Sequence, residues 1–427
     1  MFEIEKTTLE NGLKIMFVPM KETKAATIFA MVGVGSRYEK EQANGLAHFS
    51  EHMFYKGTQK LKDGFEVMRA LDDLGADFNA YTSDEETAFH ISVAGEKLLP
   101  AAEILYDILA NSKFESAEIE REKGVILEEI NMVSDNPMIY VSVLAQKLFF
   151  GETSLGRSTV GKKECVQALT REDFLSFHKN YYRPNNIILV VAGALSDKEK
   201  LMMQIKNTFG KMKSGENEKY LSYKPAQNGP AISVHSRQID QTHLILGYRG
   251  ISRIDENRPI LKVMNAILGG MSSSRLFIEI RERRGLAYYV RSDFWDFQDT
   301  GMLVAGAGVR TDKADEVIKM IRNQFQLFTN KTVSDEELER AKTNLISHLY
   351  LGLESSEEVA GFVAEREIFW GKTKKIEELV SEIKKVSKED IQKLAKELFV
   401  NKHLNLMVLG PDKDSKKIEK IIGLSSA

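Results

Sequence analysis

The sequence predicts an α+β fold of two tandem homologous domains, each a mostly antiparallel sheet covered by helices in a duplicated layer sandwich. Two observations support this prediction. The chain has 427 residues, more than one ordinary domain contains, and segments of its second half resemble segments of its first. Each half also has the same order of elements: strands, then helices and further strands, and a helix before the last strand. Long helical runs between strands favour helices packed over one face of each sheet.

The internal similarity is clearest where each half ends. LTREDFLSFHKNYYRPNNIILVVAG at residues 169–193 matches VSKEDIQKLAKELFVNKHLNLMVLG at residues 386–410, which begins 217 residues further along. Both are predicted to form a capped helix, a short turn and an apolar strand that ends on glycine. SAEIEREKGVILEEI from Ser116 likewise matches SDEELERAKTNLISH from Ser334, and both are predicted to be charged helices with a serine N-cap.

The domain boundary is predicted between these repeats. The first strands of the two halves are expected at residues 13–19, 26–36, 231–236 and 242–250. Residues 213–230 are polar, contain Gly and Pro, and lack helical or strand periodicity. We therefore expect an N-terminal domain at residues 1–212, a linker at 213–230 and a C-terminal domain at 231–427.

Composition excludes several classes of protein. Hydrophobic residues make up 43% and charged residues 28% of the chain, as in globular proteins. The net charge of −3 gives no electrostatic basis for binding nucleic acid or an anionic membrane. The single cysteine, Cys165, cannot form an internal disulfide, so any metal site has to use His and carboxylate ligands. The sequence shows neither a signal peptide nor a membrane span, so we expect a cytoplasmic protein, with removal of a targeting segment left open.

The strongest chemical motif is HxxEH, within NGLAHFSEHMFYKGTQ at residues 44–59. Helical periodicity predicts that His48 and His52 lie on one helix face, about 5–6 Å apart at Cβ, which suits a shared zinc ion. Glu51 lies at the edge of the same face, where its carboxylate can reach a metal-bound water. This order is the inverted form of HExxH.

A third ligand is expected from the helix EIEREKGVILEEINM. A catalytic zinc normally has three protein ligands and one open position. Glu122 and Glu129 are seven residues apart and share a helix face, so Glu129 is a coherent ligand with Glu122 as its support. The alternative for these motifs is a histidine pair bonded to backbone and glutamates on a solvated helix face.

HxxEH followed by ExxxxxxE resembles the pitrilysin and insulinase family of zinc metallopeptidases, in particular its short, bacterial-type members that are similar to the mitochondrial processing peptidase. The segments GLAHFSEHMFYKGT, GADFNAYTSDEETAFHISV, VILEEI and SLGRSTVG look like successive elements of that family. ILGGMSSSRLFIEIRERRGLAYYV is similar to its Gly-rich turn and Arg-to-Tyr element in the second half. The resemblance covers nearly the whole chain.

For the metal site, the resemblance implies that His48, His52 and Glu129 bind zinc. It also implies that Glu51 is the catalytic base and that Glu122 supports the site. One zinc ion per chain is expected, because no His pair recurs at zinc spacing in the second half. Cobalt or manganese could also bind such ligands.

For the substrate, the resemblance implies that Asn79 and Ala80 lie on an edge strand that pairs with the substrate backbone. Arg281 and Tyr288 match a second-half pair that contacts substrate near the zinc, although from composition alone Arg281 would be a solvated arginine. The C-terminal domain is thus expected to lack a metal site and to contribute substrate contacts.

The function that the resemblance implies is zinc-dependent endopeptidase activity on extended peptides or unfolded polypeptide segments, through a zinc-bound water activated by Glu51. Family members of this length usually work as two chains that close around a chamber, and a homodimer would suffice here. Two alternatives remain: a non-catalytic scaffold subunit on the same fold, and a module that binds zinc without chemistry. The complete set of His48, Glu51, His52 and Glu129 argues against both.

Overall fold

The computed structural model describes residues 3–411 and divides the chain into two compact units. Unit 1 consists of the described chain up to Asn131, with Arg157–Leu221 and Tyr350–Lys374. Unit 2 consists of Met132–Gly156, Ser222–Leu349 and the described chain from Lys375 onward. Each half of the sequence therefore contributes a segment to both units. The predicted tandem domains at 1–212 and 231–427 describe the repeat in the sequence, and their boundaries stay a prediction.

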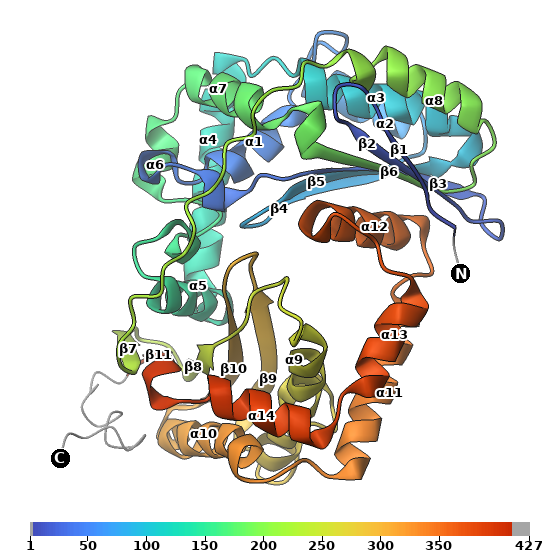
Figure 1. Ribbon diagram of the computed structural model, residues 1–427. Coiled ribbons are helices and arrows are strands. Elements are labelled where there is room, and N and C mark those ends of the chain that lie inside the picture. Colours follow the sequence, from blue (N-terminus) through green and yellow to red (C-terminus); the bar gives the residue numbers. More distant parts are fainter. Residues whose placement is uncertain (1–2, 412–427) are drawn as a thin grey trace. The chain divides into compact units, whose positions relative to one another are not determined.

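Unit 1 contains, among the described residues, a six-stranded sheet that we call sheet 1 (Figure 1). Its strands lie in the order β1 (Glu5–Thr8), β2 (Lys14–Pro19), β6 (Ile187–Gly193), β3 (Ala25–Val32), β5 (Thr87–Ala94) and β4 (Asp77–Thr82). All neighbours are antiparallel except β2 and β6. The sheet is thus mostly antiparallel, as predicted, and β4 is an edge strand.

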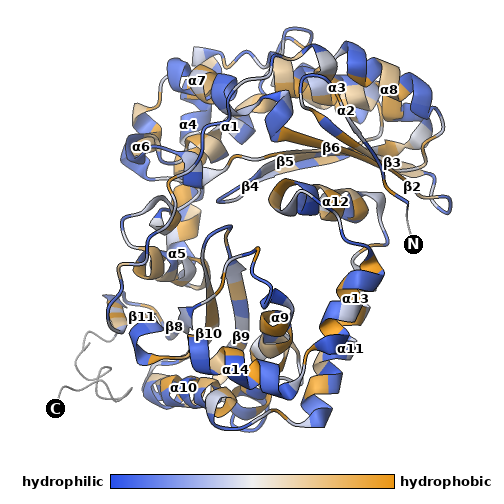
Figure 2. Cartoon of the chain, in the orientation of Figure 1, coloured by the Kyte–Doolittle hydropathy of each residue, from blue (hydrophilic) through white to orange (hydrophobic). Residues whose placement is uncertain are grey.

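Helices bury both faces of sheet 1, where the sequence predicted one covered face. One face packs with helices from the first half, including α1 (Leu46–Phe54), α3 (Leu98–Asn111) and α7 (Arg171–Tyr181), into a core that contains Phe49, Leu105 and Phe174. The other face packs against Val359, Val363 and their neighbours on α12 (Ser356–Trp370). The reason is visible in the strands, because IILVVAG and ATIFAMV are continuous apolar runs without polar alternation. Figure 2 shows the hydrophobic colour along these strands and on α12.

The helices that lie wholly or mainly in unit 1 connect and cover these strands. They are α1 (Leu46–Phe54), α2 (Gly64–Asp72), α3 (Leu98–Asn111), α4 (Ser116–Asp135), α6 (Lys163–Ala168), α7 (Arg171–Tyr181), α8 (Lys198–Asn207) and α12 (Ser356–Trp370). The last residues of α4, from Met132, belong to unit 2. No helix in the described part of the chain is long and apolar enough to cross a membrane.

Unit 2 repeats the topology of sheet 1. Its sheet, sheet 2, has the order β7 (Ala231–Ser236), β11 (Leu404–Gly410), β8 (Gln241–Arg249), β10 (Gly301–Arg310) and β9 (Ala287–Asp296). Here too a single neighbouring pair, β7 and β11, is parallel. The order corresponds strand for strand to β2, β6, β3, β5 and β4 of sheet 1. This correspondence confirms the predicted duplication.

The elements of unit 2 also follow the repeat. They are α5 (Pro137–Phe150), α9 (Arg258–Asn265), the π-helical turns η7 (Ala266–Gly270) and η8 (Phe277–Glu282), α10 (Ala314–Asn330), α11 (Asp335–Leu351), α13 (Ile376–Lys385) and α14 (Lys388–Leu398). The last residues of α11 lie in the segment that joins unit 1. One face of sheet 2 packs against α10 and α14, and the other packs against α5.

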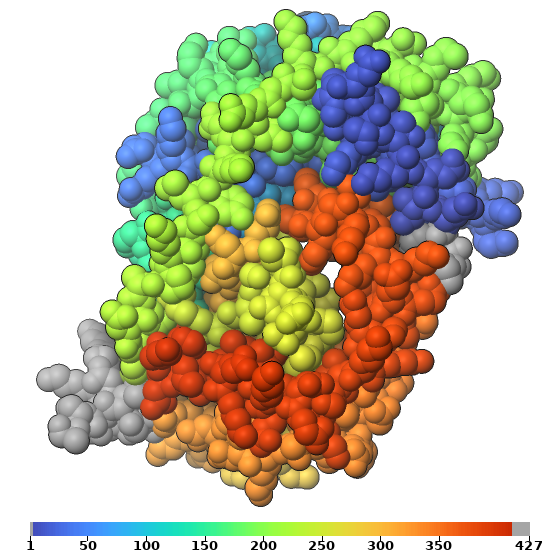
Figure 3. Space-filling model, in the orientation of Figure 1, coloured from blue at the N-terminus to red at the C-terminus, as the bar shows by residue number. Residues whose placement is uncertain are grey.

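The two halves of the chain exchange equivalent helices. Helix α5, from the first half, covers β8 and β11 of sheet 2, whereas α12, from the second half, covers β3 and β6 of sheet 1. Lys6 and Lys14 both pair with Glu367 on α12, at 2.6 and 2.8 Å. The space-filling view shows α12 against the blue N-terminal segment (Figure 3). The strands of each sheet come from one half of the sequence, but one face of each sheet is covered by a helix from the other half.

Candidate metal centre

Helix α1 presents His48, Glu51 and His52 on its less buried side. The other residues of the helix, including Phe49 and Met53, are buried in the core of unit 1 and fix the rotation of the helix. The two imidazole rings lie 4.9 Å apart between centroids. The predicted i, i+4 arrangement on one helix face is therefore what the structure contains.

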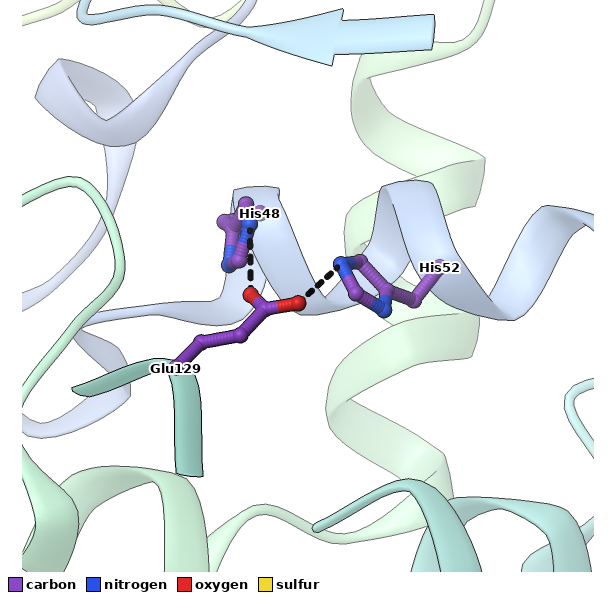
Figure 4. Close-up of side chains that lie close together, drawn as sticks. All are labelled: His48, His52 and Glu129. Atoms are coloured by element: carbon purple, nitrogen blue, oxygen red, sulfur yellow. Dashed lines mark ion pairs between the residues drawn. The ribbon is translucent and has the colours of Figure 1, made fainter. Parts of the chain in front are cut away.

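Helix α4 brings Glu129 to the two histidines. Ile119, Ile126 and Glu122 are the buried residues of this helix, and Glu129 lies two turns after Glu122 on a neighbouring position of the same face. The carboxylate of Glu129 lies between the two imidazoles in Figure 4. Its Oε2 is 3.4 Å from His48 Nε2, and its Oε1 is 3.7 Å from His52 Nε2. The neighbouring Glu128 is exposed and takes no part in this group.

The donor set fits a zinc ion. His48, His52 and Glu129 each offer one ligand atom, and these atoms lie within 4.8 Å of one another. Around a tetrahedral zinc with bonds of about 2.1 Å, neighbouring donors lie about 3.4 Å apart, close to the His48–Glu129 separation. Within residues 3–411, no other group of three His, Cys, Asp or Glu side chains converges in this way. Three ligands leave a fourth position for a reactant.

Glu122, which also binds Lys56, orients His52 through the ring nitrogen that does not face Glu129. The Nδ1 atom of His52 is 2.9 Å from Glu122 Oε1, and the other oxygen of Glu122 is 2.6 Å from Lys56 Nζ. The ring is therefore held with Nε2 toward Glu129, as a supporting carboxylate commonly does for a metal-binding histidine. The pairing of Lys56 with Glu122 was not anticipated from the sequence, because Lys56 lies beyond the end of α1 and contacts a residue of another helix.

Glu51 is held by a hydroxyl from the edge strand. Thr82 Oγ1, at the end of β4, donates to Glu51 Oε2 at 2.6 Å. Burial raises the pKa of Glu51, and the charge of Glu129 adds to this, while the Thr82 hydroxyl opposes it. A carboxylate with a raised pKa is suited to accept and release a proton near neutral pH. No local pattern in the sequence points to Thr82, because its contact with Glu51 spans 31 residues.

The two histidines differ in their electrostatic surroundings. Burial, followed by the neighbouring His52, lowers the pKa of His48 to about 4, so its imidazole is neutral and has a free lone pair at neutral pH. Burial also works to lower the pKa of His52, but the hydrogen bond with Glu122 and the charges of Glu129 and Glu122 outweigh it and raise that pKa. The carboxylates near His52 therefore give the site negative charge, which favours a bound cation.

Asn79 and Ala80 lie on β4, at the free edge of sheet 1. Asn79 is opposite His90 and Ala80 is opposite Phe89 on β5. The backbone N–H of Ala80 donates to Asn79 Oδ1 at 2.9 Å, so it points away from β5. An outward N–H on an edge strand is available to an added peptide strand. The role of both residues in substrate binding stays a prediction.

Arg281 and Tyr288 lie in unit 2, whereas the metal ligands lie in unit 1. Arg281 is on η8, with its guanidinium 5.0 Å from the Phe277 ring centroid, and Tyr288 is on the edge strand β9. Both side chains are exposed, Tyr288 by 58%. The segment between them passes from a helical turn into a strand at Gly285, where the left-handed φ of 60° suits glycine. Their contact with substrate stays a prediction.

Sequence comparison identifies the family. Two family models match: "Insulinase (Peptidase family M16)" over residues 15–163 and "Peptidase M16 inactive domain" over residues 168–345. A Streptomyces coelicolor protein described as an uncharacterized zinc protease is 31% identical over 417 residues, 96% of this chain and 90% of that protein. The chain belongs to the insulinase (M16) peptidase family. A Bacillus subtilis M16 relative with the same description is 31% identical, over 93% of this chain and 96% of its own length.

Solved structures agree with the M16 assignment of the fold. A protease from Helicobacter pylori has a TM-score of 0.90 at 24% identity and covers 96% of this chain and 100% of its own. A Pseudomonas fluorescens structure described as peptidase M16 inactive domain has a TM-score of 0.88 at 20% identity, over 96% and 98%. Complex III2 from Candida albicans contains a chain with a TM-score of 0.82 at 18% identity, over 98% and 100%. The predicted α+β fold of two homologous halves is confirmed.

Proposed function

We propose that this chain is a zinc-dependent endopeptidase that hydrolyses peptide bonds in extended peptides or unfolded polypeptide segments, with one zinc ion per chain. The observation that supports it most is the convergence of the His48, His52 and Glu129 donor atoms beside the carboxylate of Glu51. Closed structural zinc sites have four protein ligands, whereas this set has three and an adjacent base. That difference favours a catalytic metal site over a site that only stores the metal.

In the proposed mechanism, the chain's own residues bind the ion and move one proton. His48 and His52 bind through Nε2, and Glu129 binds through its carboxylate. The chemistry that bound zinc supplies is Lewis acidity toward a water and a peptide carbonyl. Glu51 takes the proton of the attacking water on Oε1, since Thr82 occupies Oε2, and delivers it to the leaving amine. Glu122 keeps the His52 ring oriented throughout.

The proposed substrate is extended because it would add to sheet 1 as another strand. The outward N–H of Ala80, now bound to Asn79 Oδ1, can donate instead to a substrate carbonyl when the Asn79 side chain rotates away. Backbone pairing of this kind tolerates many sequences, because side chains alternate away from the hydrogen bonds. β4 ends at Thr82, which binds Glu51, so a substrate strand on β4 runs past the catalytic base.

The proposal extends to unit 2 and to assembly. Arg281 and Tyr288 would contact substrate from the half that has no metal motif, and two identical chains would enclose the reaction chamber. This part of the proposal is supported by the presence of the complete metal set and the Arg281 and Tyr288 pair in one sequence. A partner chain of another sequence is then unnecessary.

The test is Glu51→Gln, measured with an internally quenched peptide and with zinc content determined on the same samples. We expect full zinc content and a loss of kcat of about 10²–10⁴-fold, because an amide fills the same space but cannot accept the proton. Glu128→Gln is the matched control, since Glu128 is exposed on α4 next to the ligand Glu129. It should behave like the wild type.

Two outcomes would overturn the proposal. Near-normal turnover by zinc-loaded Glu51→Gln would remove Glu51 as the base. No cleavage of several unrelated peptides by the zinc-loaded wild type would exclude the peptidase and favour a non-catalytic subunit on this fold.

A further inference from the structure

Glu39 is a buried carboxylate outside the metal centre whose hydrogen bonds all go to the start of the metal helix. The residue is 7% exposed and follows the short helix η1 (Ser36–Tyr38). Its Oε1 accepts from the backbone N–H of Ala47 at 2.7 Å. Its Oε2 accepts from the backbone N–H of Gly45 at 2.9 Å and from Asn44 Nδ2 at 3.0 Å. The carboxylate thus binds the segment in which α1 begins.

Helix α1 needs this carboxylate because its own N-cap residue cannot serve. The N-cap is Gly45, which has no side chain and a left-handed backbone with φ of 102°. A Cβ at Gly45 would lie 3.0 Å from Gly161 Cα, so a Ser or Asp cap at this position would collide with the neighbouring loop. The N–H groups in the first turn of a helix lack partners within the helix, and negative charge there is favourable. Glu39 supplies the acceptor and, in its ionised form, the negative charge.

The loop at residues 157–161 holds Glu39 and the helix start together. Arg157 Nη2 donates to the backbone oxygen of Glu39 at 2.7 Å, and Asn44 Nδ2 also donates to the backbone oxygen of Ser158 at 3.0 Å. Burial raises the pKa of Glu39 to about 7, and the hydrogen bonds from Ala47, Asn44 and Gly45 oppose this rise. The three hydrogen-bond donors therefore favour the ionised form of the Glu39 carboxylate.

We infer that Glu39 is a positioning residue for the metal centre, which fixes the first turn of α1 and through it the direction of the His48 imidazole. His48 is the third residue of α1 and directly follows Ala47, whose N–H is bound by Glu39. Loss of this bond frees the turn that carries His48, whereas His52 stays held by Glu122. The inference rests on the proposed function in one respect, that a metal binds at His48.

The experiment compares Glu39→Gln with Asp63→Asn in the full-length protein. Asp63 caps α2 by accepting from the N–H of Glu66, so it is a matched carboxylate cap on a helix that carries no metal ligand. Zinc affinity is measured by competition with a chromophoric chelator, and kcat and KM are measured at saturating zinc. For Glu39→Gln we expect zinc affinity to fall by about 10–100-fold and kcat to fall with KM unchanged. Asp63→Asn should leave zinc affinity and kcat unchanged, and it should change the unfolding temperature little, because Asn caps a helix about as well as Asp does.

The outcomes separate this inference from the proposed function. A lower unfolding temperature for Glu39→Gln with unchanged zinc affinity and kcat would make Glu39 a structural cap and overturn the inference. If Glu39→Gln does not fold, Glu39→Asp keeps the charge on a shorter side chain and should still bind zinc less tightly than the wild type; equal affinity would overturn the inference. If the wild type binds zinc but cleaves nothing while Glu39→Gln loses affinity, the proposed function fails and the inference stands.

Discussion

Thr82 links the edge strand to Glu51, the proposed catalytic base. Its hydroxyl donates to Glu51 from the last position of β4, the strand on which the substrate backbone is proposed to pair. One oxygen of Glu51 is thereby occupied, and in the proposed mechanism the other takes the proton. The proposed substrate strand and the proposed base would thus be positioned by one short segment.

We predict that Thr82→Val lowers kcat by about 10–100-fold with little change in KM, because a hydrogen bond to a charged group contributes about 1.5–3 kcal/mol. Valine has the same shape but cannot donate to Glu51. Steady-state kinetics on a quenched peptide measure the effect, and Thr82→Ser, which keeps the hydroxyl, is the control. Equal kcat for the Val and Ser variants would show that this hydrogen bond does not contribute to turnover.

At the scale of single residues, the sequence predicted the features of the site that depend on spacing within one helix. His48, Glu51 and His52 follow from the periodicity of one helix, and the structure brings His48 and His52 together with Glu129. Thr82, Lys56 and Glu39 were missed as partners of these residues. Their roles depend on contacts between separate elements, such as the 31-residue separation of Thr82 and Glu51, which hydrophobic periodicity does not encode.

At the scale of elements, the repeat predicted pairs of helices and strands well. The segments at 169–193 and 386–410 form α7 with β6 and α14 with β11. Ser334 caps α11 as predicted, by accepting from the N–H of Glu337. Ser116 does not have the equivalent role, because it is already within α4. The residue before the helix is Glu115, whose backbone oxygen accepts hydrogen bonds from the first turn. Helix ends depend on such single hydrogen bonds and are difficult to predict to one residue.

The start of α11 gives a prediction about acid stability. Arg275 binds Glu337 through two hydrogen bonds, of 2.6 and 2.9 Å. Burial works to raise the pKa of Glu337, but the hydrogen bonds from Arg275 and Ser334 and the charge of Arg275 lower it to about 2. Because the folded pKa lies below the ordinary value of 4.5, the pair stabilises the fold above about pH 4.5 and loses this effect as pH falls toward 2.

We therefore expect Glu337→Gln to lower the unfolding temperature at neutral pH, by the equivalent of about 1–2 kcal/mol since the pair is partly exposed. The difference from the wild type should shrink as pH is lowered from about 7 to about 3, because the wild-type carboxylate begins to take up protons. Thermal unfolding across this pH range measures it. A difference that is constant with pH would show that charge at Glu337 does not stabilise the fold.

At the scale of the whole molecule, the exchange of α5 and α12 is the feature that the sequence could not show. Neither helix was singled out from the sequence, and periodicity does not tell which sheet an apolar helix face covers. The continuous apolar strands of sheet 1 required a second cover, and the structure supplies it from residues 356–370 of the other half. Thr27 and Ser356 join the same contact through a 2.8 Å hydrogen bond between their hydroxyls.

We predict that residues 1–221 alone do not form a stable fold. Removal of α12 exposes one face of sheet 1, including Met16, Phe29 and Val190, each of which is at most 3% exposed in the complete chain. A fully buried side chain of this size contributes about 1.5–3 kcal/mol, so exposing several of them outweighs the 5–15 kcal/mol by which typical proteins are stable. Solubility, dye binding to exposed apolar surface and thermal unfolding measure the result.

Two controls separate the loss of α12 from damage caused by breaking the chain. Residues 1–221 produced together with residues 222–427 should give a folded complex, because the break lies between the two units and every helix is still present. Residues 1–221 fused through a flexible linker to residues 350–374 should recover much of the stability of unit 1, since this segment restores α12 with Glu367 for Lys6 and Lys14. A cooperative unfolding transition of residues 1–221 alone, near the wild-type temperature, would contradict the prediction, because the uncovered face of sheet 1 would then cost too little to matter.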